Sequence, residues 1–166
     1  MRPALIALLL LVAAPSVSAQ APRIERIDLV DYGIYESEFT RRIEDSKSVG
    51  GSRSGVKMIK IKERTSTIQA RNGLQFGIRF FVVGEPKDAE IRLKFVLRFP
   101  LPGMRDAATG VASYRNEYVR TAKVGWADFS GYSFDYDWEM VPGVWTFEVW
   151  EGDRKWVEQP ITVVKP

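Results

Sequence analysis

Hydrophobic and polar residues alternate over four stretches of the chain, at residues 74–82, 91–99, 132–139 and 145–150. In the second stretch, for example, Ile, Leu, Phe, Leu and Phe take the odd positions, and Arg, Lys, Val and Arg take the even ones. A period of two places successive side chains on opposite faces of a β-strand. The four stretches are therefore predicted to be strands with one buried and one solvated face.

Turn-forming residues separate these stretches, at residues 84–88, 141–143 and 151–154. Their glycine, proline and aspartate content is typical of hairpin connections. Weaker alternation predicts further strands at residues 29–35, 56–62, 114–120 and 156–164. Pro160, inside the last of these, predicts an edge strand or a bulge there. Residues 44–55 are predicted to be a flexible loop, and only the spacing of Tyr35, Phe39 and Ile43 suggests a helix.

About eight antiparallel strands without helical periodicity between them predict an all-β fold. At this chain length the expected arrangement is an immunoglobulin-like antiparallel β-sandwich of about seven to nine strands. Phe134, Trp138, Trp145 and Phe147 occupy the inward positions of their strands and are predicted to lie in the core.

The N-terminus has the three parts of a cleavable signal peptide. Arg2 is followed by an apolar run over residues 4–14 and by small residues at Val17 and Ala19. The run is shorter than the roughly 20 residues that span a bilayer, so cleavage is expected after Ala19. The predicted layout is a signal peptide at 1–19, a flexible N-terminus at 20–26 and one β-sandwich domain at 27–164. The mature chain is expected in the periplasm, with secretion as the alternative, and without a membrane span.

The sequence of 166 residues contains neither cysteine nor histidine. Disulfides, thiolate or imidazole metal sites, and Ser-His or Cys-His catalytic units are therefore excluded. The net charge of +3 falls to +2 without Arg2, too little to suggest a nucleic-acid partner. Eight basic residues lie within 40–64, and seven acidic residues without any basic one lie within 125–153. These segments are expected either to neutralise each other across adjacent strands or to form two poles for a charged partner.

Several local motifs resemble those of a bacterial family known as domain of unknown function 3859. They lie at residues 31–35 (Asp-Tyr-Gly-Ile-Tyr), 71–78, 98–103, 131–135 (Gly-Tyr-Ser-Phe-Asp) and 138–147, which contains Pro-Gly-Val-Trp-Thr-Phe. The resemblance covers about residues 27–164. It implies an exported immunoglobulin-like domain, and it carries no activity or catalytic residue to transfer.

Three residues are candidate ligand residues: Trp150, Trp156 and Glu148. Each tryptophan is expected to be partly exposed beside an acid on its own strand face, Trp150 beside Glu148 and Trp156 beside Glu158. Sugar-binding β-sandwiches stack such rings on a pyranose. Asp135, Asp137 and Glu139 are too far apart on a strand to hold one Ca²⁺ together. No metal, cofactor or catalytic residue is assigned.

Three functions remain open at this point. The first is an exported non-enzymatic interaction module that binds a protein or another envelope component, with strand addition to a sheet edge as one binding mode. The second is a carbohydrate-binding domain that uses Trp150 or Trp156. The third is a glycosidase-type enzyme that works with carboxylates alone.

Overall fold

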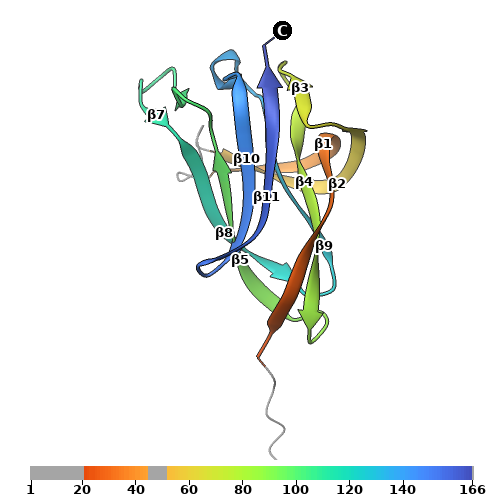
Figure 1. Cartoon of the computed structure of the whole chain (residues 1–166). Coiled ribbons are helices and arrows are strands. Elements are labelled where there is room, and N and C mark those ends of the chain that lie inside the picture. The colour runs from red at the N-terminus through yellow and green to blue at the C-terminus, as the bar shows by residue number, and fades with distance from the viewer. Residues whose placement is uncertain (1–20, 45–51, 166) are drawn as a thin grey trace, which may run out of the picture.

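In the computed structural model, the backbone is described for residues 21–44 and 52–165, and side chains are described outside 37–58. The strands form two facing sheets of four and five strands and a separate two-stranded ribbon (Figure 1). The four-stranded sheet has the order β2-β1-β4-β9, and the five-stranded sheet has the order β3-β11-β10-β5-β8. The strands are β1 (Arg23–Glu44), β2 (Ser52–Arg64), β3 (Thr67–Gln69), β4 (Gln75–Glu85), β5 (Glu90–Arg98), β6 (Met104–Arg105), β7 (Ala112–Ser113), β8 (Arg115–Lys123), β9 (Ala127–Ser133), β10 (Gly143–Glu151) and β11 (Arg154–Val164).

This architecture confirms the predicted all-β immunoglobulin-like sandwich. The two main sheets hold nine strands within the described residues, and every pairing is antiparallel except the short parallel contact of β3 with β11. Among the described residues no helix is long and apolar enough to cross a membrane.

The core lies between the two sheets and is rich in aromatic rings. Trp145 of β10 is fully buried, and its ring lies 4.8 Å from that of Phe99 and 5.5 Å from that of Phe76, centroid to centroid. Phe134 and Phe147 are buried as predicted, whereas Trp138 is only partly buried against the core. Edge-to-face ring contacts of this kind add to the hydrophobic effect of burial.

The structure differs from the predictions in three places. Residues 132–139 do not form one strand, because β9 ends at Ser133 and a short 3-10 helix, η1 (Asp137–Glu139), follows. The suggested helix over residues 35–43 is wrong, since these residues continue β1. The strand also begins at Arg23, inside the segment predicted to be flexible, because Ile24 is buried and its backbone pairs with β4.

Two further predictions concern loops and edges. Of the predicted loop at 44–55, residues 45–51 lie outside the described residues, and β2 already begins at Ser52. Pro160 does lie on an edge: β11 pairs with β10 at this position, and β3 reaches β11 only at residues 162–164.

Candidate functional site

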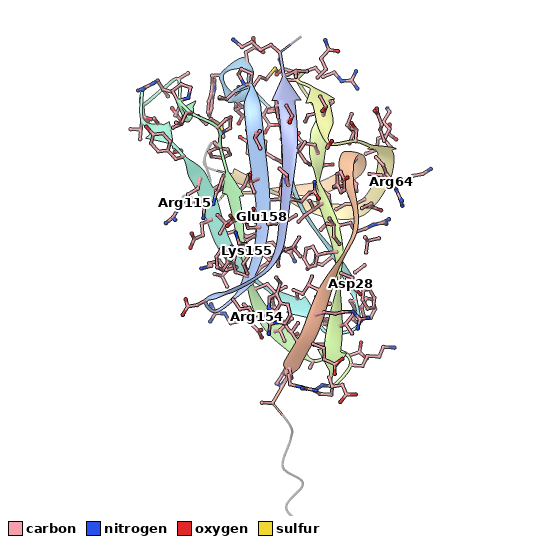
Figure 2. All side chains as sticks on the ribbon, in the orientation of Figure 1. Asp28, Arg64, Arg115, Arg154, Lys155 and Glu158 are labelled. Atoms are coloured by element: carbon pink, nitrogen blue, oxygen red, sulfur yellow. The ribbon has the colours of Figure 1, made fainter. Side chains whose placement is uncertain are left out.

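The outer face of the five-stranded sheet carries two of the three candidate ligand residues, Glu148 and Trp150. Both belong to β10, which lies between β11 and β5. The strand register places Lys94 of β5 on one side of Trp150 and Lys155 of β11 on the other. With Arg98 of β5, these side chains form the Trp150 face (Lys94, Arg98, Glu148, Trp150 and Lys155). Figure 2 shows Lys155 and Glu158 over this sheet, and Arg115 toward its β8 edge.

Glu148 is the centre of this face, and it is 3% exposed. Its carboxylate accepts a hydrogen bond from Arg98 Nε at 2.8 Å, and Lys155 Nζ lies 3.6 Å away. Burial alone raises the pKa of Glu148. The hydrogen bonds from Arg98 and Trp150 and the nearby positive charges outweigh this effect and hold its pKa below the usual value. Glu148 is therefore a fixed carboxylate and not a proton donor.

Trp150 is held in one orientation by its neighbours. Its indole N–H donates to Glu148 Oε2 at 2.9 Å. The ammonium groups of Lys94 and Lys155 lie 5.0 and 5.3 Å from the ring centroid, within the range of a cation–π interaction. The ring is partly exposed, as predicted. A sugar that stacks on it would have to compete with these lysines.

Trp156 lies elsewhere. Val157 pairs with Val149, but Lys155 pairs with Trp150, so Trp156 is the additional residue of a β-bulge. The predicted position beside Glu158 on the outer face is therefore wrong: Trp156 packs against the core, and its indole N–H donates to Glu151 at 3.3 Å. The guanidinium of Arg154 covers its ring at 3.6 Å from the centroid. The two candidate tryptophans do not form one surface.

The acids at 135, 137 and 139 do not form a row, because the chain turns into η1. Glu139 is 3% exposed, and its Oε2 accepts the backbone N–H groups of Asp135 and Tyr136 at 2.6 and 3.0 Å. Its Oε1 accepts the hydroxyl of Tyr132 at 2.9 Å. Burial raises its pKa, although these hydrogen bonds oppose the shift. Glu139 thus holds the turn together. Within the described residues no group of three acids could hold a metal ion.

A third buried acid, Asp31, was not recognised from the sequence. It lies on the outer face of the four-stranded sheet, where Arg79 forms an ion pair with it and the Tyr35 hydroxyl donates to it. Burial and this hydrogen bond raise the pKa of Tyr35 above its usual range. The only sequence signal was the motif at 31–35, which places Asp31 and Tyr35 four residues apart.

Three glycines lie beside this cluster, and one of them, Gly131, makes room for the ring of Phe129, which a Cβ atom on this glycine would overlap. Gly33, Gly77 and Gly131 lie side by side on β1, β4 and β9. Tyr35 lies on β1 and Phe129 lies on β9, with β4 between them. Because the glycines carry no side-chain carbon, they leave space over β4, and the two rings meet across this strand at 4.7 Å between centroids. A Cβ atom on Gly77 would overlap the carbonyl oxygen of Ser130. The contacts of this cluster link β1, β4 and β9, and its charged groups, Asp31 and Arg79, are paired with each other.

The basic and acidic segments do not pair with each other in the part of the chain whose side chains are described. Asp128 binds Arg120, and Glu148 binds Arg98 and Lys155. From the basic segment, Lys62 binds Glu36 and Arg64 approaches Asp31 at 3.6 Å. Other basic residues of this segment lie within 37–58, whose side chains are outside the described residues. The expected mutual neutralisation therefore receives no support from the described ion pairs.

The fold and its polar clusters define an immunoglobulin-like β-sandwich with a charged, tryptophan-bearing outer face and no assigned chemistry. The chain belongs to the family described as "Domain of unknown function (DUF3859)", whose model matches residues 23–163. This confirms the resemblance inferred from the local motifs.

A solved structure supports the same fold. An immunoglobulin-like protein from Pseudomonas aeruginosa is 22% identical to this chain and superposes with a TM-score of 0.60, covering 89% of this chain and 100% of its own. At this identity the likeness concerns the fold alone. No curated protein matches the chain.

Proposed function

We propose that this protein is an exported, non-enzymatic binding module that acts in the periplasm and contacts its partner with the Trp150 face. The observation that carries the proposal is the fixed position of Trp150 between Lys94 and Lys155, with its indole N–H bound to the buried Glu148. A large amphipathic ring that is already ordered loses little conformational entropy when a partner covers it. Such rings are typical anchors of protein interfaces.

The charges around Trp150 favour an acidic partner. By register, the outward positions of β5, β8, β10 and β11 carry six basic and four acidic side chains. One of the acids, Glu148, is buried and neutralised by Arg98. The basic residues are Arg92, Lys94, Arg98, Arg115, Lys123 and Lys155, and the acids are Glu90, Glu117, Glu148 and Glu158. An acidic protein segment would find complementary charge here, which speeds encounter and selects the partner.

The buried acids support a non-enzymatic role. Asp31 and Glu148 are both ion-paired with arginines, and Glu139 accepts hydrogen bonds from the backbone of its own turn. A general acid or nucleophile must instead be free to exchange protons or attack a substrate. The absence of histidine and cysteine from the sequence removes the most common alternatives.

Site-specific photo-crosslinking in native cells tests the proposal. A photo-reactive amino acid at Thr146, which lies on the outer face next to Glu148, should trap a discrete envelope partner. The same residue at Lys87, in the exposed turn after β4, is the control position and should not trap it. Trp150→Ala should abolish the crosslink from Thr146, whereas Trp126→Ala, at a tryptophan 54% exposed elsewhere on the molecule, should leave it intact.

The outcome also separates the alternatives. A crosslink that is equally strong from Lys87, or that survives Trp150→Ala, would refute the Trp150 face as the binding site. Competition by an envelope oligosaccharide, together with loss of binding in Trp150→Ala, would show that the ligand is a carbohydrate. Conversion of that oligosaccharide to products would overturn the non-enzymatic assignment.

A further inference from the structure

Strand β8 forms one edge of the five-stranded sheet (Figure 1), and its pairing with β5 is regular. Its nine residues, Arg115–Lys123, pair with β5 without a register shift. The sequence of the strand contains neither glycine nor proline. Natural proteins commonly protect a sheet edge with bulges, prolines or a covering segment, because a regular edge pairs readily with another strand.

The direction of the unpaired backbone groups of β8 follows from two hydrogen bonds at its ends. Phe99 N–H donates to Tyr114 O at 2.9 Å, and Val124 N–H donates to Ala89 O at 3.0 Å. In an antiparallel pair, hydrogen-bonded positions recur at every second residue. The even-numbered residues of β8 therefore direct their backbone N–H and C=O groups toward β5. The odd-numbered residues direct theirs away from the sheet, and among the described residues no backbone group pairs with them.

The same odd-numbered residues place their side chains on the outer, exposed face of the sheet, where Val119 is 48% exposed. In order along the strand they are Arg115, Glu117, Val119, Thr121 and Lys123. This order is complementary to itself when it is read in the opposite direction. With Val119 opposite Thr121 of a second copy, Glu117 lies opposite Lys123, and each pairing occurs twice.

We propose that β8 pairs antiparallel with β8 of a second copy of this chain, joining the two five-stranded sheets across a two-fold axis. In this register each exposed cross-strand position pairs opposite charges or two β-branched residues, and such pairs stabilise antiparallel strands. Arg115 lies beyond the paired region. A symmetric dimer of this kind has an isologous interface, in which the same surface of each copy is used.

The inward side of the strand is compatible with this pairing. Arg120 points into the sandwich, where it binds Asp128 in a bidentate manner and lies 4.3 Å from the ring centroid of Phe95. In the proposed register Arg120 meets its own copy at the two-fold axis. Each Arg120 guanidinium is already paired with the Asp128 carboxylate of its own copy. The two arginines and two aspartates near the axis therefore carry no net charge.

The dimer would place both Trp150 faces on the same side of one continuous sheet. Five strand spacings would separate the two β10 strands, which corresponds to about 24 Å. Two binding surfaces at a fixed separation bind a repeated or extended partner more tightly than either does alone. The dimer can form whether or not the Trp150 face is a binding site, so the two proposals fail independently.

A charge exchange tests both the dimer and its register. Sedimentation velocity of the protein purified after expression of the full-length chain should show a dimer at micromolar concentration. Glu117→Lys and Lys123→Glu should each weaken the dimer by about tenfold, because two attractive pairs become repulsive. The double variant should restore it. Lys87→Glu, in the exposed turn after β4, is the charge-matched control and should change nothing.

A backbone variant tests strand pairing itself. Val119→Pro removes an N–H that points away from β5, so the fold should persist, as proline is tolerated at such an edge position. Its thermal melt should resemble that of Val119→Thr, which keeps the N–H, but only the threonine variant should dimerise. A wild-type protein that remains monomeric, or a dimer unaffected by Val119→Pro, would refute the interface. Failure of the double charge variant to restore the dimer would refute the register.

Discussion

Arg98→Leu should destabilise the protein at neutral pH by about 2 kcal/mol. The guanidinium donates to Glu148 through Nε at 2.8 Å and through Nη2 at 3.4 Å. A hydrogen bond to a charged group contributes roughly 1.5–3 kcal/mol. The second bond is long, and the Arg98 side chain is 49% exposed, so solvent screening places the sum near the lower end of that range. Trp150 and Lys155 continue to hold the carboxylate in the variant.

The pH dependence distinguishes this explanation from a simple loss of packing. Because the pKa of Glu148 is lowered in the folded protein, the stabilisation is complete above the pKa of the unfolded chain, about 4.3. It is lost as pH falls through the folded pKa. The difference between wild type and Arg98→Leu should therefore shrink as the solution becomes more acidic.

Urea titrations followed by tryptophan fluorescence, at constant ionic strength and several pH values, measure this difference. Arg92→Leu is the matched control, because Arg92 lies on the same strand and face and has no ion pair among the described side chains; we expect it to cost under about 0.5 kcal/mol. A cost for Arg98→Leu as small as that of the control, or one independent of pH, would refute the account of Glu148.

Three further predictions have defined outcomes. Trp145→Ala should cost about 3–5 kcal/mol in the same urea assay, since it empties a fully buried site; a loss below about 1 kcal/mol would contradict the packing. Burial raises the pKa of Glu139, so wild-type stability should decline as pH rises from the unfolded value through the folded pKa, and Glu139→Gln should lack this decline in thermal melts. Intact-mass measurement of the envelope protein should give a chain that begins at Gln20; retention of Met1 would contradict cleavage after Ala19.

The alternating pattern predicted the core strands because each sheet has one buried and one solvated face. For this reason the pattern places Phe134, Trp145 and Phe147 in the core, where the structure buries them. The pattern failed at residues 134–139, where aromatic and acidic residues alternate as in a strand. There Glu139 folds back onto the backbone of its own turn, an interaction that periodicity does not encode.

The candidate site was predicted less completely, because it depends on register. One additional residue in β11 moves Trp156 away from the outer face, and a bulge of this kind leaves no clear mark in the sequence. The position of Trp150 beside Glu148 followed from their spacing of two. The lysines on either side of Trp150 come from two other strands, so only the pairing of those strands could identify them.

The edges of the two main sheets differ in a way that bears on partner binding. The first half of β1 lies at an edge, because β2 pairs with it only from Gly33 onward, and it is interrupted by two register shifts. Such irregularities discourage the addition of a strand. At β8 the protection consists of charges alone, with Arg115 and Lys123 exposed and Arg120 directed inward. Charges repel an unsuitable strand, but they attract a strand with the complementary order, and a second β8 has that order. The same residues that would protect this edge from random pairing therefore make it selective for another copy of the chain.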